Sequence, residues 1–168
     1  MSSIIRADKW QNALGQSYNT VLQVVSTTKT DTASTTTQSY QDITGMSVSI
    51  TPKFATSKIL VLASYQTGSS NSNTTVAVRL VRDSTAICIG DAASNRTRAS
   101  TNGYTEFQGT FSINYLDSPN TTSATTYKLQ WYSAGGSVCY MNRVNFNDDD
   151  NAARPRTAST ITVMEIAQ

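Results

Sequence analysis

Apolar and polar residues alternate along much of this chain with a period of two, which is typical of half-buried β-strands. In residues 46–51 the apolar Met46, Val48 and Ile50 alternate with Ser and Thr, and a proline follows. In residues 107–115 apolar or small residues from Phe107 to Tyr115 alternate with polar ones. Each segment predicts a strand with one face toward a core and the other toward solvent.

Further strand-like runs follow at short spacing, separated by pieces rich in Gly, Pro, Asn and Asp that are typical of turns. They cover residues 21–28, 38–44, 58–67, 75–82, 85–90, 125–132, 138–143 and 159–166. Val, Ile and Thr together number 47 of the 168 residues, a composition that favours strands. We therefore expect an all-β chain whose residues 21–168 form a single jelly-roll or β-sandwich domain of about 8–10 antiparallel strands.

The segment at residues 58–65, KILVLASY, is apolar on both of its faces. This pattern predicts a central strand that is covered on both sides. In a two-layer sandwich only one side faces the core, so the second cover would come from a neighbouring subunit. On this reasoning Ile59, Val61 and Tyr65 are candidates for a subunit interface.

Residues 1–20 lack a regular period. Their apolar residues are Ile4, Ile5, Trp10 and Leu14, and Gly15 ends the apolar spacing. One interpretation is an attachment arm that packs these four side chains on a partner, since Trp buries a large area at interfaces. A short turn or helix folded back on its own domain is equally compatible with the pattern.

Composition argues against an enzyme. The chain has 22 Ser and 26 Thr, no His and only two Glu. The missing His excludes His-based triads and His metal sites, and no GxSxG or SxxK arrangement activates a hydroxyl. We expect no catalytic residues and no cofactor.

Charge and hydropathy limit the partners. Charged residues make up 14% of the chain, and 13 basic against 11 acidic residues give a net charge of +2. This weak balance predicts no nucleic-acid binding. The longest purely apolar run is residues 59–63, and MSSIIRADKW lacks a signal-peptide pattern, so neither membrane insertion nor Sec export is expected.

Three weaker features leave alternatives open. Asp148 and Asp150 are weak candidates for a calcium site, although a solvated acidic loop explains them better, because the fixed Gly and Glu of an EF-hand are missing. Cys88 and Cys139 are compatible with a disulfide, but two buried thiols are favoured. Tyrosines near loops suit either a glycan-binding surface or the sandwich core.

Three phrases carry a resemblance to a known group. The segment STTKTDTASTTTQSYQDITGMSVSITPKFATSKILVLASYQTG, the later INYLDSPNTTSATTYKLQW and the final ASTITVMEI resemble virion proteins of tailed phages, particularly those of marine and cyanobacterial hosts. The resemblance covers residues 21–168. In that group the part resembling SITPKFATSKILV joins two strands. The part resembling LDSPNTTSATTYKLQW makes a turn and a long strand, and the ending resembling STITVMEI is the last core strand.

The resemblance implies a small jelly roll on the particle surface that assembles in the host cytoplasm. It implies a homotrimer, whose partners are other virion proteins. It implies capsid decoration or a short tail-fibre component, and it brings no catalytic or ligand residues. A receptor- or glycan-binding domain for host adsorption is the alternative. A typical fibre has a long shaft, whereas at most twenty residues precede this domain.

Overall fold

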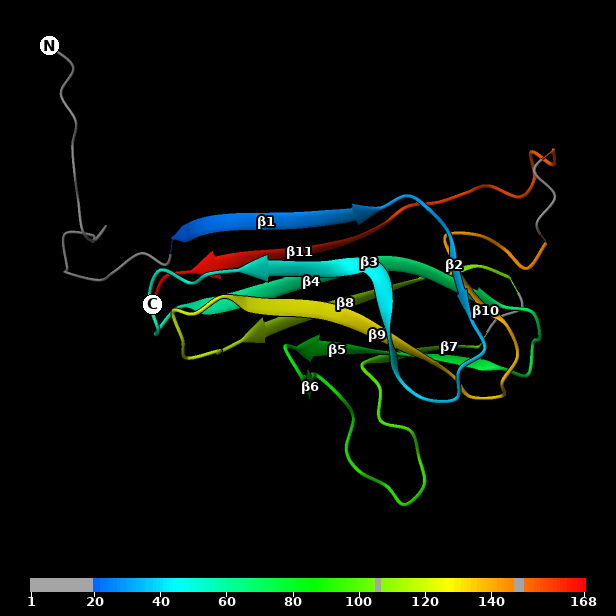
Figure 1. Cartoon of the computed structure of the whole chain (residues 1–168), viewed down its shortest axis with the longest axis horizontal. Coiled ribbons are helices and arrows are strands. Elements are labelled where there is room, and N and C mark those ends of the chain that lie inside the picture. The colour runs from blue at the N-terminus through cyan, green and yellow to red at the C-terminus, as the bar shows by residue number, and fades with distance from the viewer. Residues whose placement is uncertain (1–19, 105–106, 147–149) are drawn as a thin grey trace, which may run out of the picture.

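The computed structural model describes residues 20–104, 107–146 and 150–168, which form two antiparallel sheets packed as a β-sandwich (Figure 1). These residues contain strands and no helix, so the all-β prediction is confirmed, in a jelly-roll-like form. The strands are β1 (Val21–Lys29), β2 (Ala33–Thr35), β3 (Gln41–Ile50), β4 (Lys58–Ser69), β5 (Thr75–Arg82), β6 (Thr85–Ile87), β7 (Thr101–Tyr104), β8 (Gly109–Asp117), β9 (Thr125–Ser133), β10 (Cys139–Met141) and β11 (Ser159–Ile166).

The first sheet is built around β4, the longest strand. Its order is β1-β11-β4-β10-β2, and β8 pairs with the other edge of β4. β11 pairs with the first half of β4 and β10 with its end. At the end where β1 starts, the sheet is therefore four strands wide, β1-β11-β4-β8, with β1 and β8 at its edges.

The second sheet has the order β3-β9-β5-β6, with β7 also paired to β5. Its inner face packs on that of the first sheet. The inward positions of β9, from Tyr127 to Trp131, alternate with outward polar residues, as a half-buried strand requires. Together the two inner faces bury one continuous apolar cluster.

A partly buried ion pair joins the two sheets: the Arg82 side chain is 26% exposed and that of Asp117 is 6% exposed. Arg82 Nη1 of β5 donates to both carboxylate oxygens of Asp117 in β8, at 2.9 Å each. The Tyr127 hydroxyl of β9 donates to Asp117 Oδ2 at 2.7 Å. Burial, with the neighbouring Asp117 carboxylate, raises the pKa of Tyr127. Arg82 and Tyr127 satisfy a carboxylate that would otherwise be costly to bury.

The predicted strands at residues 38–44 and 46–51 form a single strand, β3. Its pairing with β9 shifts between Asp42 and Ser47, and Gly45 within that shift has φ +82°. Across this shift four residues of β3 (43–46) lie opposite one residue of β9, so the strand continues through an irregularity larger than a one-residue β-bulge. The prediction of two separate strands was therefore wrong.

Other differences from the predicted strands are local. β6 ends at Ile87 because Cys88 has φ 53°, which interrupts an extended strand. β8 begins at Gly109, so Phe107 lies outside the strand and is 64% exposed instead of inward. The short strands β2 and β7 have no apolar alternation and were not predicted.

Candidate functional site

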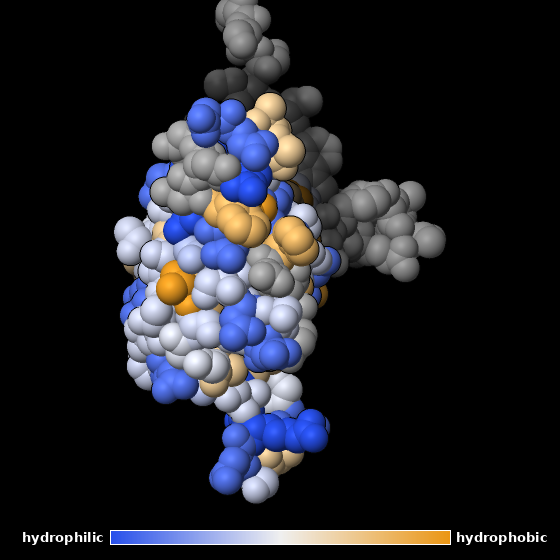
Figure 2. Space-filling model, turned by 90° about the vertical axis from the view of Figure 1, so that its right-hand side faces the viewer, coloured by the Kyte–Doolittle hydropathy of each residue, from blue (hydrophilic) through white to orange (hydrophobic). Residues whose placement is uncertain are grey.

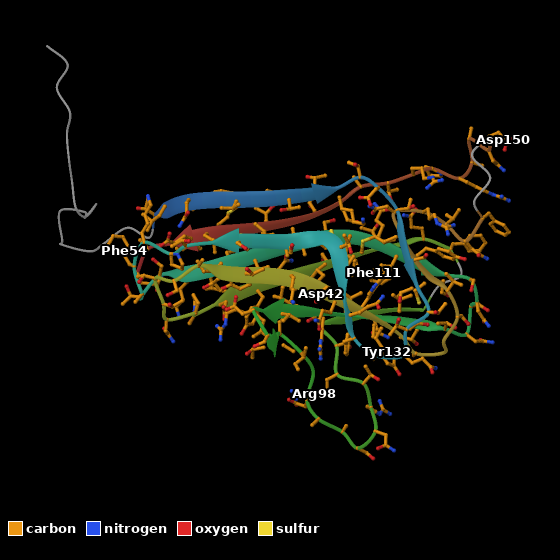
Figure 3. The ribbon with its side chains drawn as sticks, in the orientation of Figure 1. Asp42, Phe54, Arg98, Phe111, Tyr132 and Asp150 are labelled. Atoms are coloured by element: carbon orange, nitrogen blue, oxygen red, sulfur yellow. The ribbon has the colours of Figure 1, made fainter. Side chains whose placement is uncertain are left out.

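The predicted subunit-interface residues Ile59, Val61 and Tyr65 face the interior of the sandwich. Each is 0% exposed within the single chain. Phe111, labelled in Figure 3, stacks on the Tyr65 ring with centroids 6.1 Å apart. The Tyr65 hydroxyl bonds Thr101 of the second sheet, and burial raises its pKa to about 12. The assignment of these three side chains to an interface was wrong, because the chain's own core already covers them.

The other face of β4 is the one left open. Leu60 and Leu62 alternate with the buried positions and are partly exposed. Leu60 stands in a row that the strand register builds across four strands, in the order Val24, Met164, Leu60, Leu116. Residues paired directly across strands share a face, so this row is a continuous apolar stripe on the outside of the sheet.

The rows on either side of this stripe differ in character. Toward the start of β1, Val21 pairs with Ile166, which pairs with Lys58. On the other side lie rows of mostly hydroxyl and amide side chains: Ser26, Thr162, Leu62 and Asn114, then Thr28, Thr160, Ser64 and Ser112. We call these four rows the outer face of the first sheet; Lys58, at its rim, is its one charged residue.

The outer face of the second sheet carries charged side chains that bond to one another. Lys128 Nζ lies 2.8 Å from Asp42 Oδ2, and Gln130 Nε2 donates to Asp42 Oδ1 at 2.7 Å. Arg79 donates to Gln130 Oε1 through Nε and Nη2, at 2.9 and 2.7 Å. The hydrogen bond from Lys128, and to a smaller extent that from Gln130, holds the pKa of Asp42 below its usual value.

Two aromatic rings continue this network. The Arg79 guanidinium lies 3.9 Å from the centroid of the Tyr40 ring, and the Tyr40 and Tyr132 rings are 5.6 Å apart. The Tyr40 hydroxyl donates to the carbonyl of Arg98 at 2.7 Å, which joins the sheet to the β6–β7 loop. Asp42, Tyr132 and Arg98 are labelled in Figure 3. This face thus carries an arginine over one ring of a tilted pair of tyrosines.

The loop between β6 and β7 projects from the sandwich (Figure 1), and in Figure 2 it is the mainly hydrophilic protrusion at the bottom. It borders a pocket of about 320 Å³ that is lined by Gly90, Asp91, the segment 96–102 and Thr75 of β5. Arg98 Nε donates to the carbonyl of Gly90 at 2.6 Å and braces the loop. The pocket is open and mostly lined by loop residues.

The three phrases that carry the family resemblance occupy the positions expected of them. SITPKFATSKILV, within the first, joins β3 to β4. LDSPNTTSATTYKLQW, within the second, runs from the end of β8 through a turn into β9, and STITVMEI is β11. Glu165 of β11, 0% exposed, ties two of them together, because its Oε1 accepts from the amides of Lys53 and Phe54 at 2.7 and 3.4 Å. Gln23 donates to Oε2 at 2.6 Å. These phrases therefore describe scaffold contacts.

The remaining candidates bring no site together. The attachment-arm residues Ile4, Ile5, Trp10 and Leu14 lie outside the described residues, as does Asp148. Asp150, at the end opposite Phe54 in Figure 3, is exposed. Cys88 and Cys139 are free thiols, and burial raises the pKa of both.

Within the ranges that the structure describes, no group of three or more acidic or Cys side chains is placed to hold a metal ion. In the same ranges no helix has the length and apolar character needed to cross a bilayer. That the chain is not an enzyme and takes no cofactor stays a prediction from composition.

The class defined by the geometry is an antiparallel β-sandwich with two unlike outer faces. A comparison with protein-family models finds no match, and a comparison with curated proteins finds none either. Similar solved structures come from infectious bursal disease virus. The structure of its Gt strain has 13% identity and a TM-score of 0.46, over 96% of this chain and 44% of that chain.

A second similar structure is the VP2 subviral particle of the same virus, with 12% identity and a TM-score of 0.44, over 96% of this chain and 43% of that chain. This chain thus spans less than half the length of these neighbours. Both are viral structures, and values this low carry no argument about what this chain does.

Proposed function

We propose that this chain is a non-enzymatic structural protein on the surface of a tailed-phage particle. It acts as a homotrimer, either as capsid decoration or as a short tail-fibre component, with other virion proteins as partners. Residues 1–20 form the attachment arm through Ile4, Ile5, Trp10 and Leu14. The protein assembles in the host cytoplasm and resides in the virion.

The observation that carries this proposal is the resemblance of residues 21–168 to virion proteins of tailed phages. The surface chemistry supports it. A protein assembled in the cytoplasm needs no disulfide, and Cys88 and Cys139 are free thiols. A surface wetted by Ser, Thr, Asn and Gln, with 14% charged residues, stays soluble over a wide range of salt, since little of its solubility depends on screened charge.

Quantitative mass spectrometry of purified particles of the encoding phage tests the proposal. We expect the chain in the particle at a fixed ratio to the major capsid protein. A copy number similar to that of the capsid subunits indicates decoration, whereas a number similar to that of the tail components indicates a fibre. Absence of the chain from purified particles would overturn the proposal.

The second candidate function is recognition of a host-surface glycan. The observation that favours it is the tilted pair of Tyr132 and Tyr40, with Arg79 over the Tyr40 ring, beside the projecting β6–β7 loop, because sugar rings pack on aromatic faces. Saturable binding of the full chain to host cells, lost in Tyr132→Ala but retained in Thr44→Ala on the exposed part of β3, would support it. Equal binding of both variants would reject this surface.

A further inference from the structure

The outer face of the first sheet exposes more apolar surface than a sheet facing water needs. Val24 is 54% exposed, Leu116 52% and Val21 51%. Met164 and Leu60 fill the stripe between Val24 and Leu116. Single exposed apolar residues are ordinary on protein surfaces, but a contiguous stripe across four strands marks an interaction site.

We propose that the occupant of this face is a second copy of the same chain. In the proposed homotrimer, the four rows defined above face the three-fold axis and contact the same rows of the neighbouring copies, with the stripe from Val24 to Leu116 at the centre of the contact. This interface rests on the proposed homo-oligomeric role and gives it a location.

The chemistry of the face suits a copy of itself. A surface that meets its own copy cannot carry fixed charge of one sign at its centre, because like charges then face each other. The only charged residue in these four rows is Lys58, at the rim, where its Nζ donates to Ser118 Oγ at 2.7 Å. The hydroxyl rows both donate and accept hydrogen bonds, so a second set of hydroxyls satisfies them without any change of sequence.

The area of the outer face of the first sheet also bears on what occupies it. The four rows cover at most eight residues of any one strand, so they span about 15–20 Å across the strands and 20–25 Å along them, given standard strand spacing and rise. Such a footprint lies at the low end of specific protein interfaces, at about 600 Å² or less per partner. A lone peptide or a small ligand would cover one or two rows and leave half-exposed apolar side chains in water.

The second sheet provides the internal contrast. Its outer face holds Asp42, Lys128 and Arg79 in bonds within the chain. Docking a copy there would remove fixed charges from water, which is costly without new partners. The asymmetry between the faces therefore assigns the contact to the first sheet.

The test compares the full chain with two double variants by light scattering over a dilution series. The Val24→Glu and Leu116→Glu double variant places two carboxylates on the stripe at side chains that are more than half exposed, so the folded chain tolerates them. The Thr44→Glu and Ser47→Glu double variant adds the same charge at exposed positions of β3 in the second sheet. Far-UV circular dichroism checks folding in each case.

We expect the unaltered chain at a multiple of 18.2 kDa, the β3 variant at the same multiple, and the stripe variant at 18.2 kDa. The dissociation constant of the stripe variant should rise at least about tenfold. If the stripe variant does not fold, the Val24→Thr and Leu116→Thr double variant keeps β-propensity and should shift the equilibrium in the same direction.

Two results would overturn the proposal. One is an unaltered chain with a mass of 18.2 kDa at every concentration, which includes the case in which residues 1–19 of the same chain cover the face. The other is a folded stripe variant that keeps the mass of the unaltered chain. Presence of the chain in purified particles together with either result would reject this interface while leaving the virion role standing.

Discussion

On the outer face of the second sheet, Asp42 accepts bonds from Lys128 and Gln130, and Arg79 stacks on Tyr40. On the outer face of the first sheet, the corresponding central positions are Met164 and Leu60, flanked by half-exposed Val24 and Leu116. The polar side chains of the second sheet's outer face form hydrogen bonds and ion pairs within the chain, whereas the outer face of the first sheet leaves apolar side chains exposed to water. The difference teaches that a sandwich can have one face suited to solvent and one suited to a partner.

The Arg82–Asp117 ion pair links the two sheets, so its loss should have the largest effect. In Asp117→Asn, Arg82 loses its carboxylate partner and Tyr127 its charged acceptor, so the free energy of unfolding should fall by on the order of 3 kcal/mol. Urea unfolding measures this effect. Asp42→Asn, an exposed acid with a Lys partner, is the matched control, and equal losses in the two variants would contradict the account.

Glu165 should have the next largest effect, at the end of the first sheet where the apolar stripe lies. Burial alone raises the pKa of its carboxyl, but the bonds from Gln23 and the amides of Lys53 and Phe54 outweigh burial and hold this pKa below its usual value. Glu165→Gln keeps the shape but loses the charge, so we expect a loss of about 1–3 kcal/mol at neutral pH.

The lowered pKa of Glu165 also sets a pH dependence. A carboxyl whose pKa is depressed in the folded state stabilises the fold above its unfolded pKa of about 4.3, and this contribution disappears as the pH falls through the folded value. Thermal unfolding from neutral pH to about pH 2 should therefore show the stability gap between the unaltered chain and Glu165→Gln closing below about pH 4. A gap that is constant with pH would contradict this role.

The smallest effect should come from the charged network of the second sheet. Asp42→Asn breaks a solvent-exposed ion pair with Lys128, so the free energy of unfolding should change by less than about 1 kcal/mol. Its mass in light scattering should match that of the unaltered chain. If the Asp42→Asn protein dissociated, the contact between copies would involve the second sheet, and the account would be contradicted.

Much of the fold follows from the sequence, because alternation is a direct consequence of strand geometry. The strands predicted at residues 75–82 and 159–166 match β5 and β11 at both ends. Backbone conformation explains the failures: alternation does not reveal the positive φ at Gly45 within the irregular part of β3, or the one at Cys88 that ends β6. β2 and β7 form where neighbouring strands provide an edge, which local pattern cannot show.

The interface candidates were predicted on the face of β4 that the structure places in the core. A strand that is apolar on both sides gives no direct sign of which side faces the core. One signal was present in the sequence. The face that carries Ile59 stays apolar as far as Tyr65, whereas the face that carries Leu60 becomes polar at Ser64. Val24 and Leu116 could not have been added to the stripe without the register, since they lie far apart in the chain.

The central claim, that the first sheet presents the contact face and the second does not, is tested most directly by hydroxyl-radical footprinting of the full chain at concentrations above and below its dissociation. We predict that oxidation of Met164 and Leu116 slows in the associated state, while that of Tyr40 and Tyr132 stays the same. Unchanged rates at Met164 and Leu116, with protection at Tyr40 and Tyr132 instead, would contradict the claim.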